Sequence, residues 1–158
     1  MANTQSMCTS FMGELLTATH NFGTAPTRGA STADTFKAAL YVTTATVNAS
    51  TTAYSATNEV SGTGYTAGGV TVTNATAPAS TNTSSTAGTA YWTPSASITY
   101  TSVTLTTAFD CVLIYNSTQS NKAVSVHTFG SQTVTAGTFT LTMPSNTTST
   151  ALIRLATT

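Results

Sequence analysis

Residues 108–115 have the sequence AFDCVLIY, an apolar run that only Asp110 interrupts. A short continuous apolar run is typical of a strand that is buried on both faces, so this segment predicts a central strand of a sheet. Cys111 within the run is expected to behave as a small buried hydrophobic residue. We interpret Asp110 as a strand-end residue bonded to a loop, in preference to a buried functional carboxylate.

Apolar and polar side chains alternate with a period of two in several other segments, and such alternation predicts half-buried strands. These segments are residues 36–42, 70–72, 98–105, 124–126, 139–143 and 152–155. Runs rich in Gly, Asn, Ser and Thr separate them and predict turns. The longest such run, residues 74–89, is expected to be an exposed excursion or a loop ordered by a neighbouring copy.

The predicted architecture is all-β. Seven or eight short strands with regular turns indicate a β-sandwich or jelly roll. Residues 1–22 are expected to form an N-terminal arm, which is either irregular or contains a helix of one or two turns that Ser10 caps. Residues 23–158 then form a single domain, and a chain of 158 residues is long enough to enclose one hydrophobic core.

The chain carries very little charge. Charged residues make up 5% of the sequence and the formal net charge is +0, whereas about 25% is usual in globular domains. The polar surface must therefore consist of hydroxyls and amides, mostly of threonine, a β-branched residue that suits strands. A neutral surface favours association, so the composition predicts a subunit of a larger assembly.

Several partners and locations are disfavoured by the same composition. The basic residues are Arg28, Lys37, Lys122 and Arg154. They are too scattered to form a phosphate-binding patch, so no nucleic-acid partner is expected. No apolar run approaches the ~18 residues of a membrane span, and the N-terminus lacks the features of a signal peptide. Cys8 and Cys111 are expected to remain unpaired in a reducing compartment.

Residues able to carry out catalysis are few. The acids are Glu14, Asp34, Glu59 and Asp110, and the histidines are His20 and His127. None of them has the spacing of a metal site such as H-E-x-x-H, and no G-x-S-x-G elbow is present. His127 is placed at a strand end and would need a neighbouring acid to act as a base. We therefore predict no catalytic residue, no cofactor and no metal site.

Residues 62–69 have the sequence GTGYTAGG, in which four of the eight residues are glycine. This density predicts positive φ angles or a close approach of two backbones. The spacing does not match a dinucleotide-binding fingerprint. We therefore interpret Gly62, Gly64, Gly68 and Gly69 as a structural turn that Tyr65 anchors.

The apolar residues of the arm are the candidate partner interface. They are Phe11, Leu15, Leu16 and Phe22. Short exposed apolar segments often dock onto a partner, because exposed apolar patches mark interaction sites. The alternative, which the sequence leaves open, is that the arm packs on its own domain.

The segment EVSGTGYTAGG at residues 59–69 resembles a motif of small structural proteins of tailed bacteriophages. The surrounding features follow a similar order: TFKAALY at 35–41, the single Trp92, VLIYN at 112–116 and ALIRL at 151–155. The resemblance extends from about residue 11 to the end of the chain. One departure is His127-Thr128 before Phe129-Gly130, where similar chains tend to carry an acidic residue.

This resemblance implies a virion structural protein that is made in the host cytoplasm. Capsid decoration (cement) proteins of this size are commonly β-sandwich or jelly-roll trimers at local three-fold axes. The expected partners are therefore further copies in a homotrimer and the major capsid protein or other virion proteins. A tail, neck or fibre component is the alternative. A carbohydrate-binding module that uses exposed tyrosines such as Tyr65 and Tyr91 is a second alternative.

Overall fold

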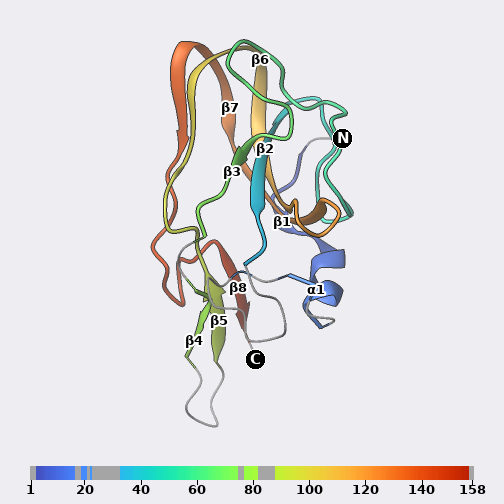
Figure 1. Cartoon of the computed structure of the whole chain (residues 1–158), viewed down its shortest axis with the longest axis vertical. Helices are drawn as coiled ribbons and strands as arrows, with labels where there is room; N and C mark the ends of the chain where they lie inside the picture. Colours follow the sequence, from blue (N-terminus) through green and yellow to red (C-terminus); the bar gives the residue numbers. More distant parts are fainter. Residues whose placement is uncertain are drawn as a thin grey trace.

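The chain folds into two antiparallel sheets (Figure 1). The computed structural model describes residues 3–16, 19–20, 22, 33–74, 77–81 and 88–156. Their elements are β1 (Ser6–Met7), α1 (Thr9–Leu16), β2 (Phe36–Val42), β3 (Val70–Thr71), β4 (Ala79–Ser80), β5 (Thr89–Trp92), β6 (Ile98–Asn116), β7 (Lys122–Leu141) and β8 (Ile153–Ala156). The larger sheet has the order β1-β7-β6-β2-β3 and the smaller one β4-β5-β8. The all-β prediction is confirmed, and the arrangement is sandwich-like.

Strands β6 and β7 form a hairpin that is longer than any strand the sequence predicts. β6 has 19 residues and joins the predicted strands 98–105 and 108–115. β7 has 20 residues and joins the predicted strand 124–126 to most of 139–143. The intervening residues are mainly threonine, serine and glycine. Threonine favours extended backbone, and the pairing of the two strands absorbs the irregular spacing through several register shifts.

The hairpin folds back over the rest of its own sheet. In Figure 1 both strands curve at the top of the molecule, so that 98–105 and 134–141 lie beside the central strands. The Tyr100 hydroxyl donates a hydrogen bond of 2.8 Å to the carbonyl oxygen of Ala38 in β2. This contact joins the first part of β6 to the middle of the sheet. Part of the hydrophobic core lies between these two layers.

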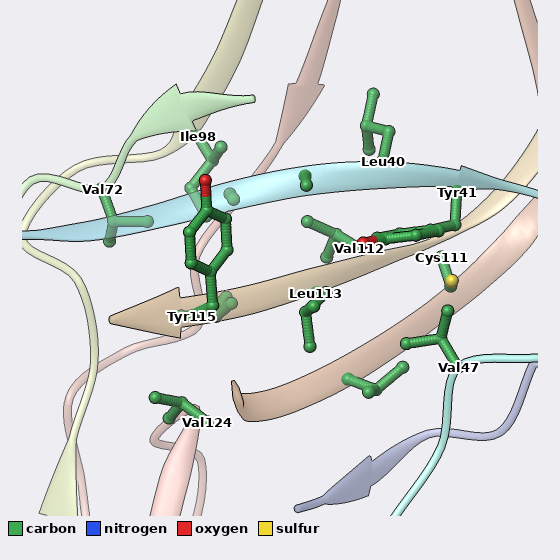
Figure 2. Close-up of a cluster of buried hydrophobic side chains, with 14 of the residues drawn as sticks. Leu40, Tyr41, Val47, Val72, Ile98, Cys111, Val112, Leu113, Tyr115 and Val124 are labelled. Carbon is green, nitrogen blue, oxygen red and sulfur yellow. The ribbon is translucent and has the colours of Figure 1, made fainter. Parts of the chain in front are cut away.

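Strand β2 is buried on both faces, and the prediction of a half-buried strand is wrong here. Leu40 is 0% exposed on one side, while Ala39 and Tyr41 on the other are 0% and 2% exposed. Figure 2 shows Leu40 and Leu113 projecting from neighbouring strands to opposite sides of the sheet. The second face is covered because the segment after β2 returns over it, where the Tyr41 hydroxyl donates to the Ser55 carbonyl at 2.6 Å.

An aromatic cluster joins the N-terminal segment to the smaller sheet. The rings of Phe22 and Phe36 stack with centroids 4.4 Å apart, and Trp92 of β5 lies 4.7 Å from Phe22. Strand β5 was not predicted, and it pairs with β4 inside the segment expected to be a loop. Residues 75–76 and 82–87 of that segment lie outside the described residues. Residues from the predicted arm and the predicted domain thus share one core.

Candidate functional site

Three of the four candidate interface residues of the arm face their own domain. Phe11 is 1% exposed and Phe22 is 8% exposed, and both belong to the hydrophobic core. Leu15 is partly buried and packs against the same core. The side chain of Leu16 lies outside the described part of the structure. For these three residues the structure shows the intramolecular alternative, and a contact between the arm and a partner stays a prediction.

Helix α1 starts differently from the sequence prediction. It begins at Thr9, so Ser10 lies inside the helix instead of capping it. The Ser10 hydroxyl is buried without a hydrogen-bond partner among the described residues. The position of the helix start is fixed by a contact with β7. The amide of Cys8, the residue before the helix, donates to the Val124 carbonyl at 3.1 Å. The predicted cap is therefore wrong.

A chain of polar side chains, of which His20, Asp34 and Asn116 are buried, fixes the arm to the hairpin. His20 Nε2 lies 2.7 Å from a Glu14 carboxylate oxygen, and its Nδ1 lies 3.1 Å from Asn116 Nδ2. Asn116 Nδ2 also donates to Asp34 at 2.7 Å. Lys122 donates to the second Glu14 oxygen at 2.7 Å. Burial by itself raises the pKa of Glu14, but the hydrogen bonds and charges of Lys122 and His20 outweigh it and lower that pKa.

The predicted glycine turn has the backbone geometry that requires glycine. Gly64, Gly68 and Gly69 have φ angles of 78°, 88° and 71°. A methyl group on Gly62 would overlap the backbone oxygen of Thr104, and one on Gly69 would overlap that of Ala38. The segment thus lies directly against β6 on one side and β2 on the other.

Glu59 is the centre of the bonds that hold this segment. Its carboxylate accepts the hydroxyls of Tyr54 and Tyr65, each at 2.7 Å, and the amide of Gly68 at 2.8 Å. The Tyr115 hydroxyl in turn donates to the Gly68 carbonyl at 2.8 Å. Burial and the hydrogen bond to Glu59 both raise the pKa of Tyr65, so its hydroxyl remains a donor. Sequence reasoning gave Glu59 no role in the turn.

This segment also closes the free edge of β2. Strand β3 pairs only with Lys37 and Ala38. Beyond that point the Val60 amide donates to the Leu40 carbonyl at 3.0 Å, and the Leu40 amide donates to the Tyr65 hydroxyl at 3.0 Å. Tyr65 is partly buried and its ring stacks on Tyr100. The expectation that Tyr65 is exposed, on which the carbohydrate-binding alternative partly depends, is therefore wrong.

Asp110 and the two cysteines have structural surroundings. Asp110 lies within β6, not at its end, and accepts a hydrogen bond of 2.6 Å from Asn3 of the N-terminal segment. Cys8 and Cys111 are free and buried. Burial, with a smaller effect of Glu14, raises the pKa of Cys8 to about 11. Burial and Asp110 raise that of Cys111 to about 12. Neither thiol is therefore a nucleophile at neutral pH.

His127 lies inside strand β7, so the prediction that it ends a strand is wrong. Its Nε2 lies 2.9 Å from the Ser125 hydroxyl, and burial lowers the pKa of His127 to about 4. A groove of about 260 Å³ between β1, β7 and β8 passes these two side chains. Ser125 is only 3% exposed. No acidic residue is bonded to His127 within the described chain, so the pair lacks the third member of a catalytic triad.

The burial of neutral His127 predicts a loss of stability in mild acid. At pH values well above 6.5 the histidine is neutral in both the folded and the unfolded chain. As the pH falls from 6.5 towards 4, the unfolded chain takes up a proton that the folded chain excludes, so the free energy of unfolding decreases. We expect a decrease on the order of 2 kcal/mol. Urea unfolding of the wild type and of His127→Gln at pH 7 and pH 5 measures it.

The variant supplies the control for that measurement. His127→Gln removes this titration, so its stability should change less between the two pH values than that of the wild type. An equal change in both proteins would show that another group causes the loss. Glu14 also contributes to stability, and this contribution is lost at lower pH. Its pKa in the folded chain lies below the ordinary value of 4.5, so the loss occurs mainly as the pH falls below 4.5.

The outer edge of β7 is uncovered over most of its length. Strand β1 pairs with β7 only at Val126 and Ser125. From Thr128 to Leu141, no strand of the described chain pairs with this edge. Most residues from Gly130 to Thr140 are exposed. This edge could not be predicted from the sequence, although the sequence does show that no Asp, Glu, Lys or Arg lies between Lys122 and Arg154.

Comparisons with known proteins add no identification. No protein-family model, no curated protein and no solved structure matches this chain. No group of three or more His, Cys, Asp or Glu side chains in the described ranges is arranged to hold a metal ion. Among the same residues, no helix has the length and apolar character needed to cross a membrane.

Proposed function

We propose that this chain is a non-enzymatic virion structural protein of a tailed bacteriophage, most specifically a capsid decoration (cement) protein. It binds the outer surface of the shell as an oligomer and stabilises the assembled lattice. The β-sandwich or jelly-roll assignment belongs to this proposal. Its support is the hairpin of β6 and β7, which supplies strands to two layers.

One observation carries the proposal: the fold bonds its four acidic groups internally, so that its exposed strands carry little negative charge. The chain has four acidic residues. Glu59 holds the glycine segment, Asp110 holds the N-terminal segment through Asn3, and Glu14 and Asp34 hold the arm to the hairpin. The exposed strands present mostly hydroxyl groups. Such a surface can approach identical or neutral neighbours without charge repulsion.

The proposed mechanism is stabilisation by selective binding. A protein that binds the assembled shell, and not the separated subunits, shifts the equilibrium towards the shell by mass action. A folded domain of two sheets suits this role, because little order has to be gained on binding. Neutral hydroxyl surface buried against capsid subunits would provide the contact.

The test is binding to expanded capsids of the phage that encodes this chain. We expect saturable binding of the labelled chain to the outer capsid surface and a higher melting temperature of decorated shells. Electron microscopy of the particles locates the label. Absence of binding, with a correctly folded chain, would overturn the decoration role.

The alternatives give different outcomes in the same system. A tail, neck or fibre role would be supported if particles that lack the protein have normal shells but defective tails or defective adsorption to the host. Retention of the isolated chain on glycans would support the carbohydrate-binding module. The partial burial of Tyr65 and Tyr91 weakens that second alternative.

A further inference from the structure

A small apolar cavity lies between the two layers that the hairpin forms. Its volume is about 140 Å³. Its walls include apolar side chains of β6, of β7 and of the segment between β7 and β8, namely Ile98, Val112, Ile114, Leu141, Met143 and Leu152. A cavity of about 150 Å³ with walls of this kind accepts a benzene ring. This cavity therefore has room for one aromatic or branched aliphatic group.

A polar groove adjoins the cavity, because His127 and Leu152 line both hollows. The groove has a volume of about 260 Å³ and is also lined by Ser125 of β7 and by Arg154 of β8. None of the described residues that line it is acidic. The two hollows together have an apolar end and a polar end, and the polar end carries one positive charge.

Arg154 supplies that charge and has unused hydrogen-bond donors. Its side chain is exposed, and within the described chain it makes one hydrogen bond, of 3.4 Å from Nη1 to the Thr148 carbonyl. Neither of the ion pairs between described residues includes it. A guanidinium binds a carboxylate through two parallel hydrogen bonds. Arg154 therefore retains the donors that a carboxylate requires.

His127 lies where the cavity and the groove meet, and it adds no charge there. Burial lowers its pKa to about 4, so the imidazole is neutral at pH 7. Its Nε2 lies 2.9 Å from the Ser125 hydroxyl. Among the described residues that line the two hollows, Arg154 is thus the charged one at neutral pH.

We propose that the cavity and the groove together bind a small amphipathic carboxylate. Its aromatic or branched aliphatic group enters the cavity, and its carboxylate pairs with Arg154. Sites for small molecules are typically apolar hollows with a few converging polar groups. Transfer of the apolar group from water provides most of the affinity, and the ion pair selects the acid over a neutral analogue.

This inference goes beyond the proposed function and does not depend on it. A small acid should bind the isolated chain in solution without a capsid. Failure of acid binding would leave capsid binding untouched, and failure of capsid binding would leave the ligand site intact.

The experiment titrates the full chain at pH 7 with phenylacetate, 3-phenylpropionate and 4-phenylbutyrate, which differ in the distance between ring and carboxylate. For at least one of these acids we expect saturable binding with a Kd of about 1 mM or lower. Nuclear Overhauser effects should connect its ring protons to the methyl groups of Ile114 and Leu152. The matching neutral amide should bind about three- to fivefold more weakly, which is the effect of one exposed ion pair.

The variant Arg154→Gln tests the polar end of the site. It should bind the acid and the amide equally, while its affinity for the amide stays that of the wild type. The control Lys37→Gln removes the same charge from β2, at a position that lines neither hollow, and should keep the preference for the acid.

Three results would overturn the proposal. One is the absence of saturable binding for all three acids. Another is an equal affinity of the wild type for acid and amide, or a preference for the acid that persists in Arg154→Gln. The last is contact of the ring protons with methyl groups outside the cavity.

Discussion

Replacing Gly69 by alanine is expected to lower the free energy of unfolding by about 3–4 kcal/mol. Two costs combine. The φ of 71° is a left-handed conformation that costs a non-glycine residue about 1–2 kcal/mol. The added methyl group would also overlap the carbonyl oxygen of Ala38 and lie 2.8 Å from the Cα of Ala39. Both atoms belong to the backbone of central strand β2, which cannot move without disturbing the core.

Gly130→Ala is the matched control for this prediction. Gly130 is exposed, has no positive φ, and an added methyl group there meets no atom within 4 Å. Its replacement should change stability by less than about 0.5 kcal/mol. Urea unfolding of the wild type, Gly69→Ala and Gly130→Ala measures the two stability changes, provided that the free energy of unfolding falls with urea concentration at the same slope m in all three. Equal stability of the two variants would show that β2 and the glycine segment are not in close contact.

The second large effect is expected for Glu59→Gln, at about 2–3 kcal/mol of lost stability. The carboxylate accepts three hydrogen bonds, from Tyr54, Tyr65 and Gly68. A glutamine has one acceptor oxygen, and its amide group would face at least one of these donors. Hydrogen bonds to a charged group are stronger than neutral ones, so the loss exceeds that of a single ordinary bond.

Asp110→Asn is the control for the loss of a negative charge. Asp110 accepts one hydrogen bond, from Asn3, and an asparagine oxygen can still accept it. We expect a loss of about 1 kcal/mol or less. Tyr65→Phe combined with Glu59→Gln then tests the assigned contact. Additive losses would contradict a direct bond between these two residues, whereas a shared loss supports it.

The strands could be predicted from the sequence more reliably than their connections. The apolar run 108–115 became the buried part of β6, between β2 and β7, because a segment with one polar side chain in eight residues has to be covered on both faces. The joining of 98–105 to 108–115 could not be predicted. Threonines at 106 and 107 are compatible with either a turn or an extended strand, and the partner strand decides between them.

The glycine turn could be predicted from the sequence, whereas the position of the apolar arm could not. The need for glycine at Gly64, Gly68 and Gly69 follows from local composition, and their φ angles agree with it. The position of Phe11 and Phe22 in the core depends on Phe36 and Trp92, which are distant in the sequence. An apolar arm has the same sequence pattern whether it docks on its own domain or on a partner.

The near absence of charge and the abundance of threonine are set by the sequence alone, and they favour extended strands with few charged side chains. Tertiary structure decided where the few charges go. Glu59, Asp110 and Glu14 each bond to residues that only folding brings near them or holds in place. Tertiary structure also decided which strand edge is left unpaired. An edge is covered or free according to the path of segments that are distant in the sequence. The segment that carries Val60 and Tyr65, for example, covers the edge of β2.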